Sequence, residues 1–243
     1  MTAVVVLAEL EIFCSRPHAP TRRVALGDAD LPCEPPPGFG GVLLAGIVAH
    51  HVGDVDPDHI PELGRLTHDL EAGRRIPQPR LRHRLQADRV GLNPMRHRLR
   101  GEGERLWFDF PTAHAAEQQV LGAVYAAGRL DPHLRAPVMD LIRRAMVWRG
   151  PVGREFITVM AGVKQGTTFD RVALEDPVAW ALGVMGFDTA AVVGGETSPA
   201  ARDIVRRYRS LLREAHPDHG ARSDGAAQRI ADLTEARRIL TGR

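Results

Sequence analysis

Two amphipathic helices joined by a short loop constrain the fold of this chain more than any other feature. The first is expected to start with Ser198 as N-cap and to end near Ala215, with apolar residues at helical spacing. The loop covers His216–Gly225. The second helix places four apolar residues on one side: Ile230, Leu233, Ala236 and Leu240. Because two such helices can bury their apolar stripes against each other, the sequence predicts a helical hairpin.

A stretch without periodicity separates this hairpin from the rest of the chain. It covers Val163–Asp176 and is followed by a short predicted helix, Pro177–Val184. We therefore predict three parts, an α+β domain at 1–165, a linker at 166–175 and a helical domain at 176–243.

The predicted loop opens with His216-Pro217-Asp218. Tyr208 with a leucine three residues later precedes it, and a Glu-Ala pair at 235–236 follows it. With Ala181–Val184 upstream, these residues stand at the spacing of the DnaJ-type J-domain, which segment 176–243 resembles. The resemblance implies three helices, the last two forming the hairpin. Arg237 stands where that family often has an aromatic residue.

The resemblance also implies a function and a binding site. In that family, the second helix and the His-Pro-Asp loop dock on a DnaK-type ATPase and trigger ATP hydrolysis. The chain is therefore expected to be a co-chaperone with a DnaK-type partner and a protein client. The implied DnaK-binding residues are Arg206, Arg207, Tyr208, Arg209, Arg213, His216, Pro217 and Asp218. Since the partner performs the chemistry, no catalytic residue, cofactor or metal is expected here.

Physical arguments agree with this interpretation. Pro217 disfavours helix at His216, and Asp218 offers a carboxylate that can accept a bidentate bond from an arginine. The arginines of the preceding helix can steer it onto an acidic surface. The alternatives are that these arginines form only a solvated face, and that the tripeptide only caps a helix and makes a turn.

Residues 1–165 match no family that we recognise, and their pattern predicts an α+β fold. Val4–Phe13 is expected to be a strand, with Thr21–Leu26 as its partner. Arg80–Phe110 alternates in polarity and is expected to form an antiparallel three-stranded meander. The predicted helices are Gly41–Val52, Pro61–Gly73, Ala115–Leu130, Leu134–Trp148 and Arg154–Ala161.

A nucleic-acid-binding protein is the alternative function. Nine arginines against the single acidic residue Asp88 lie in Arg74–Arg100, and such a basic surface could bind nucleic acid, with the C-terminal helices as a docking module. No aromatic residues stand between these arginines, so we do not expect nucleic acid as a partner.

Two other clusters are weaker candidates for binding sites. His50, His51, Asp54, Asp56, Asp58 and His59 could suggest a metal site, but their spacing fits no standard ligand pattern. Gly38–Gly41 precedes a helix as phosphate loops do, but it follows prolines, so a turn is expected.

The expected location is the cytoplasm. Cys14 and Cys33 are too few for a disulfide framework. The apolar run Val4–Ala8 lacks the basic start of a signal peptide, and Gly41–Ala49 is too short to span a bilayer.

Overall fold

A computed structural model describes residues 4–16, 19, 22–102, 105–111, 115–161, 176–187, 199–215 and 226–241. The fold is α+β, as predicted. The chain divides into two compact units. One, here called the sheet unit, comprises Ala8–Leu99 and Phe108–Gly162. The other, the C-terminal unit, comprises Val163–Arg243 with the short segments Met1–Leu7 and Arg100–Trp107. The predicted linker 166–175 lies outside the described residues.

Five strands form one sheet in the order β3-β2-β1-β4-β5. They are β1 (Val5–Cys14), β2 (Arg23–Asp30), β3 (Arg84–Leu85), β4 (Asn93–Glu102) and β5 (Arg105–Asp109). The predicted pairing of the first two strands is confirmed, because β1 and β2 are antiparallel with Ile12 opposite Leu26. β1 lies at the centre of the sheet, which fits the burial of most of its residues.

The predicted three-stranded meander is wrong. β4 and β5 are neighbours, but β3 lies at the opposite edge, where it pairs in parallel with β2. The polarity alternation marks the strands correctly, but it holds no information on which strands pair. β1 occupies the place beside β4 that the meander would have given to β3.

A tight turn before β3 directs the chain to that edge. Arg80 and His83 form an isolated antiparallel bridge, and the two residues between them, Leu81 and Arg82, have φ angles of 47° and 59°. Such angles are uncommon outside glycine, and a buried leucine there is an outlier. Two hydrogen bonds of Leu81 stabilise the turn. The Leu81 amide donates to the Glu62 carboxylate at 3.4 Å, and Nδ1 of His83 lies 2.6 Å from the Leu81 carbonyl oxygen.

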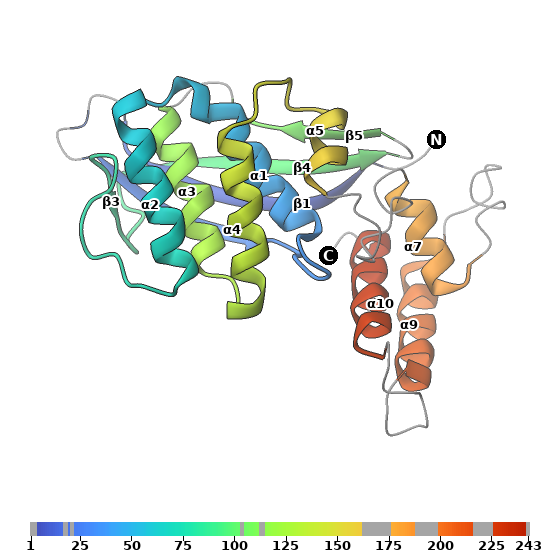
Figure 1. The fold of residues 1–243 in the computed structure, drawn as a ribbon. Coiled ribbons are helices and arrows are strands. Elements are labelled where there is room, and N and C mark those ends of the chain that lie inside the picture. Colours follow the sequence, from blue (N-terminus) through green and yellow to red (C-terminus); the bar gives the residue numbers. More distant parts are fainter. Residues whose placement is uncertain are drawn as a thin grey trace. The chain divides into compact units, whose positions relative to one another are not determined.

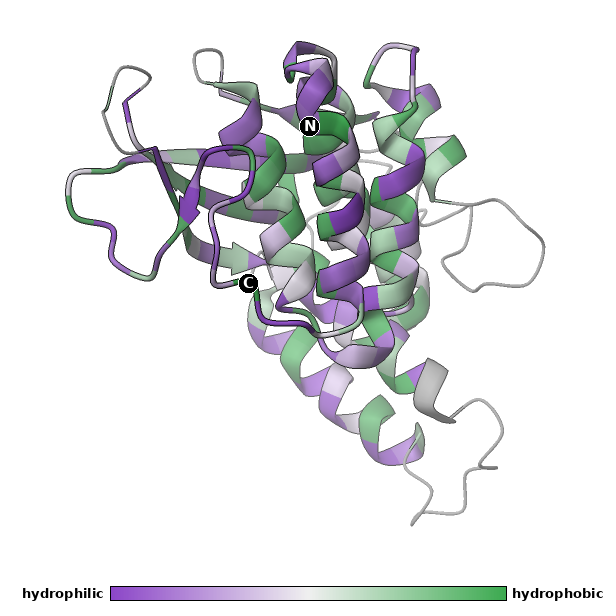
Figure 2. Cartoon of the chain, turned by 60° about the vertical axis from the view of Figure 1, so that its left-hand side comes forward, coloured by the Kyte–Doolittle hydropathy of each residue, from purple (hydrophilic) through white to green (hydrophobic). Residues whose placement is uncertain are grey.

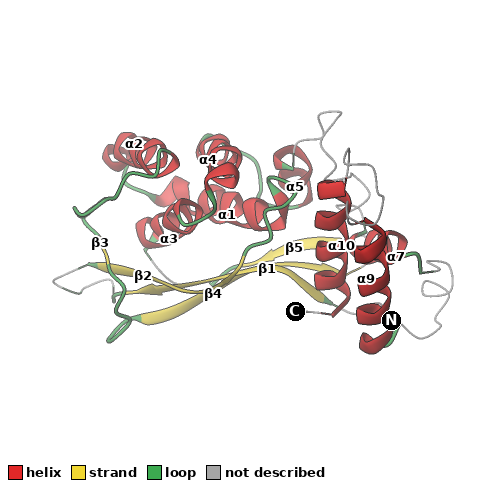
Figure 3. Ribbon diagram, turned by 90° about the horizontal axis from the view of Figure 1, so that it is seen from below, coloured by secondary structure: helices red, strands yellow, loops and turns green. Residues whose placement is uncertain are grey.

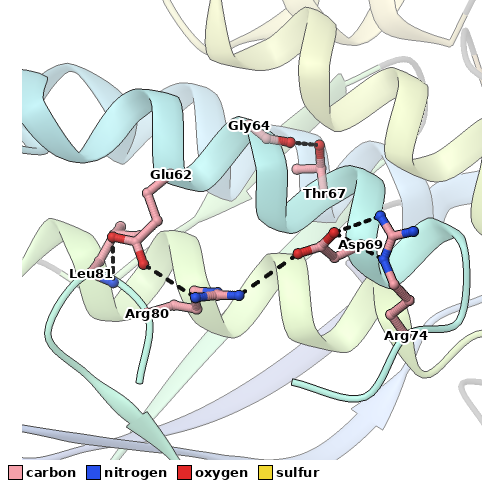
Figure 4. A network of polar contacts seen from close by, with 7 residues as sticks. All are labelled: Glu62, Gly64, Thr67, Asp69, Arg74, Arg80 and Leu81. Carbon is pink, nitrogen blue, oxygen red and sulfur yellow. Dashed lines mark hydrogen bonds and ion pairs between the residues drawn. The ribbon is translucent and has the colours of Figure 1, made fainter. Parts of the chain in front are cut away.

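A chain of charged contacts ties this turn to the helix that precedes it (Figure 4). Arg80 lies 3.8 Å from Glu62 and 3.8 Å from Asp69, and Asp69 also accepts from Arg74 at 2.6 Å. Both carboxylates belong to helix α2 (Ile60–Glu71). Because the bonds are partly exposed, each contributes modestly, and their joint effect is to fix where the segment after α2 runs.

The helices of the sheet unit lie on one face of the sheet (Figures 1 and 3). They are α1 (Gly38–His51), α2, α3 (Ala116–Gly128), α4 (Pro132–Met146) and α5 (Arg154–Met160), with two short 3-10 turns, Val52–Asp54 and Pro57–His59, between α1 and α2. All five were expected from the sequence, and their ends shift by a few residues. Hydrophilic and hydrophobic residues are interspersed along the helices (Figure 2).

Helix α1 is the exception, because it is apolar on every side. Twelve of its fourteen residues are buried, and it packs against α3, α4 and α5. It approaches the sheet closely at Gly46, where a Cβ atom would lie 2.5 Å from Cε1 of Phe108. Glycine is therefore required there by the close approach of the helix to the ring.

The C-terminal unit contains three described helices, α7 (Pro177–Met185), α9 (Ala201–Ala215) and α10 (Ala226–Thr241). α10 packs against both α7 and α9, and α9 and α10 lie side by side (Figure 1). Their buried side chains include Leu182 and Met185 of α7, Ile204 of α9, and Leu233, Ala236 and Ile239 of α10. The helix expected from Ser198 is described from Ala201, where the Asp203 and Ile204 amides donate to the Ala200 carbonyl, and the expected N-cap, Ser198, lies outside the described residues.

We predict that Gly46→Ala lowers the thermal midpoint of the full chain. Overpacking of a filled interior costs about 1–3 kcal/mol, which corresponds to several degrees for a chain of this size. Gly64→Ala is the control, because it also replaces a helical glycine but its Cβ would meet nothing within 4 Å. The control should be neutral or raise the midpoint. Equal midpoints for the two variants in differential scanning calorimetry would contradict the close packing of α1.

The buried His83 predicts a pH dependence of stability. Burial lowers the pKa of His83 below its ordinary value, so the native state favours the neutral ring. Its contribution to stability is present above the unfolded pKa of about 6.5 and is lost as the pH falls below it. Between about pH 7 and pH 5, the denaturant midpoint should fall less steeply in His83→Gln than in the wild type. The control, His68→Gln, changes an exposed histidine and should show the same fall as the wild type. If the midpoint of His83→Gln fell with pH as steeply as that of the wild type, His83 would not contribute to the pH dependence of stability.

Candidate functional site

The implied docking helix, α9, exposes a basic surface. Arg206, Arg209 and Arg213 are exposed, and the Arg206 side chain is 83% accessible while it pairs with Asp203 at 3.0 Å. Arg213 donates to the Arg209 carbonyl one turn earlier, at 3.3 Å. These contacts lie within α9 itself, so the three guanidinium groups remain accessible to a partner.

Arg207 has a different role from its neighbours. Its Nε donates at 3.0 Å to the carbonyl of Met185, the last residue of α7. α7 ends there in a left-handed Gly186 with φ of 69°, whose amide bonds back to Gly183. A cation at the carbonyl end of a helix is favourable, because those carbonyls carry partial negative charge. Arg207 therefore joins α9 to α7, a contact that the sequence pattern does not predict.

Tyr208 lies at the interface of α9 and α10. Its side chain is half-buried, its hydroxyl is 3.3 Å from the hydroxyl of Thr234, and the Arg237 guanidinium lies 5.1 Å from its ring centroid. The J-domain resemblance implies an aromatic residue at position 237, where this chain has arginine. The structure shows that the arginine covers the tyrosine ring, and a cation over an aromatic face stabilises such a contact by about 0.5–2 kcal/mol.

An ion pair on α10 was missed by the sequence interpretation. Glu235 and Arg238 lie 2.9 Å apart with side-chain accessibilities of 6% and 13%. Their spacing of three residues along a helix was the available signal. A second arginine of α10, Arg229, donates to the Val184 carbonyl of α7 at 3.4 Å. Guanidinium groups thus link each pair of neighbouring helices in the C-terminal unit.

The His216-Pro217-Asp218 tripeptide lies outside the described residues. α9 ends at Ala215, the residue immediately before it, which is the end that the proline at position 217 predicts.

Several arginines of Arg74–Arg100 are paired with carboxylates. Within the described residues, these contact an acidic side chain: Arg74, Arg80, Arg89, Arg96 and Arg98. On β4, Arg96 bonds Glu11 at 3.1 Å and Arg98 bonds Glu9 at 2.6 Å. Arg89 lies 5.0 Å from the centroid of the Phe13 ring. The local positive charge that the sequence suggested is therefore reduced by glutamates from β1, far away in the chain.

The other two clusters do not assemble into sites. No group of three His, Cys, Asp or Glu side chains in the described part of the chain is arranged to hold a metal ion. His50 and His51 instead pack their rings against Phe110, at 4.9 and 6.2 Å between centroids. Gly38–Gly41 forms the buried first turn of α1, where the Gly40 amide donates to the Pro32 carbonyl at 2.8 Å.

Comparison with known proteins identifies no relative: no protein-family model, no curated protein and no solved structure matches this chain. None of the helices in the described ranges is both long and apolar enough to cross a bilayer.

We predict that Arg207→Met loosens α7, whereas Arg209→Met does not. Loss of the bond to the Met185 carbonyl removes about 1 kcal/mol of local stability. Amide hydrogen exchange of the full chain, measured by mass spectrometry over Pro177–Met185, should become several-fold faster in Arg207→Met alone. Identical exchange in the two variants would show that the bond has no structural role.

Proposed function

We propose that this protein is a J-domain co-chaperone. Its C-terminal unit docks on a DnaK-type ATPase and stimulates ATP hydrolysis, and residues 1–165 supply specificity for a client or a location. The chemistry belongs to the partner, so the chain itself acts as a binding protein.

This proposal is supported mainly by the pattern of burial in the C-terminal unit, which agrees with the J-domain pattern of the sequence. Of the apolar positions of the pattern, Ile204, Leu233 and Ala236 are buried, the pattern's other apolar positions on α9 and α10 are half-buried, and the tyrosine, Tyr208, lies where α9 meets α10. The positions that the family uses for docking, such as Arg206 and Arg209, are exposed on α9. A chain selected only for a stable hairpin has no need of this basic surface next to a His-Pro-Asp sequence.

Electrostatic attraction between α9 and the ATPase is expected to favour docking through α9. The exposed arginines of α9 suit an acidic surface on the ATPase, and such complementarity raises the association rate more than the final affinity. Asp218 offers a carboxylate for an arginine of the partner. The Arg74–Arg100 segment supports a nucleic-acid function less well, because several of its arginines, among them Arg96 and Arg98, contact carboxylates.

The test is single-turnover ATP hydrolysis by the DnaK-type ATPase of the same organism. We expect the full chain to stimulate hydrolysis, and Asp218→Asn and His216→Gln to return the rate to its basal value. Asp224→Asn, in the same predicted loop but outside the tripeptide, is the matched control and should keep full stimulation. Stimulation by Asp218→Asn that equals the wild type, at unchanged circular dichroism, would refute the co-chaperone function.

Charge reversal tests the docking surface separately. Arg206→Glu and Arg209→Glu should each weaken binding to the ATPase by about 3- to 10-fold and make the affinity less sensitive to salt. Arg149→Glu, an exposed arginine of the sheet unit, is the control and should leave both unchanged.

A further inference from the structure

Strand β5 forms one edge of the sheet, and within the described residues its neighbour in the sheet is β4 (Figure 1). The opposite edge is β3, which has only two residues, whereas β5 has five. An edge strand presents amide and carbonyl groups that a further strand can bond, and proteins commonly protect such edges by short strands, proline or like charges. Arg105–Asp109 contains no proline, and its two charges have opposite sign. A strand of another chain can therefore extend the sheet here.

The apolar side chains of β5 fix the position of this edge. Leu106 is 8% exposed, and the Phe108 ring lies 6.0 Å from the Phe156 ring of α5 between centroids. Because the strand is already ordered by these contacts, a partner strand would lose little free energy in ordering it. Successive side chains of a strand point to opposite faces, so the other face carries the remaining three residues of β5: Arg105, Trp107 and Asp109.

The order of charges along β5 makes the strand complementary to a second copy of itself. In an antiparallel pair centred on Trp107, Arg105 of each copy lies opposite Asp109 of the other, and the two Trp107 side chains are direct neighbours. Arg105 is exposed, and the Asp109 side chain is 45% exposed while it lies 3.9 Å from Arg98. Since a carboxylate can accept from more than one donor, the contact with Arg98 leaves Asp109 able to bind a second arginine.

We propose that two copies of this chain associate by antiparallel pairing of their β5 strands, which joins their sheets edge to edge. The pair has two-fold symmetry, the commonest symmetry of soluble oligomers. A contact of five residues from each copy is smaller than a standard interface, and standard interfaces range from micromolar to picomolar affinity. The dimer is therefore weak, with a dissociation constant of about 1 μM or above. It does not depend on the proposed co-chaperone function, because no residue of α9 takes part.

The experiment is sedimentation velocity of the full chain between about 1 and 200 μM, which spans the affinity expected for a small interface. The fraction of dimer should increase with concentration in the wild type. Arg105→Asp and Asp109→Arg each place like charges opposite one another at both ends of the strand pair, so each should weaken self-association by about tenfold or more. Arg65→Asp makes the same change at an exposed arginine of α2 and should dimerise like the wild type.

A mixture of the two charge variants distinguishes strand pairing from damage to the fold. When Arg105→Asp and Asp109→Arg chains are mixed, each chain meets opposite charges on the other at both ends of the pair, so dimers of one chain of each kind should form with affinity close to that of the wild type. Circular dichroism of both variants should be unchanged. A wild type that stays monomeric at about 200 μM would overturn the proposal and leave the edge to another strand, such as a client segment. Dimers that persist in both single variants, or a mixture that stays monomeric, would also overturn it.

Discussion

Helix α1 contacts the sheet through a glycine, and the arrangement of the sheet unit depends on that close approach. Gly46 leaves room for the ring of Phe108, so an apolar helix can lie directly against the strands. Because α1 is largely buried and α3 is buried at eleven of its thirteen residues, the outer helices α2, α4 and α5 supply the surfaces that face water. The same packing brings the ends of α1 and α4 together. The two short 3-10 turns after His51 and the segment after α4 then border a cavity of about 550 Å³.

Local features of this fold could be predicted from the sequence, because local patterns determine them. β-branched residues mark β1, and helical spacing marks α2 and α3. The pairing of β3 with β2 could not be predicted, because it joins segments about sixty residues apart through a strand of two residues. The turn that makes this pairing possible has Leu81 and Arg82 at positive φ, where sequence rules expect glycine or asparagine.

Long-range charge pairs limited what could be predicted of binding surfaces. The sequence shows nine arginines and one aspartate between positions 74 and 100, yet Glu9 and Glu11 lie 89 and 85 residues from the arginines that they bond. Only the central position of β1, next to β4, brings these glutamates to Arg96 and Arg98. A basic run in a sequence therefore predicts a basic surface only when neighbouring strands add no opposite charge.

The C-terminal unit shows how one residue type serves two purposes. Arg207, Arg229 and Arg237 contact α7 carbonyls or the Tyr208 ring and so join helices, whereas Arg206 and Arg209 point to solvent. On α9, the positions along the helix could have distinguished the arginine that joins helices from the one that faces solvent. Arg206 and Arg207 point in directions that differ by about 100° around the helix axis. The planar guanidinium can stack on a ring or bond a carbonyl while its aliphatic stem covers apolar surface. Arginine at position 237 can therefore cover the Tyr208 ring in this interface, while Arg206 and Arg209 of α9 stay exposed.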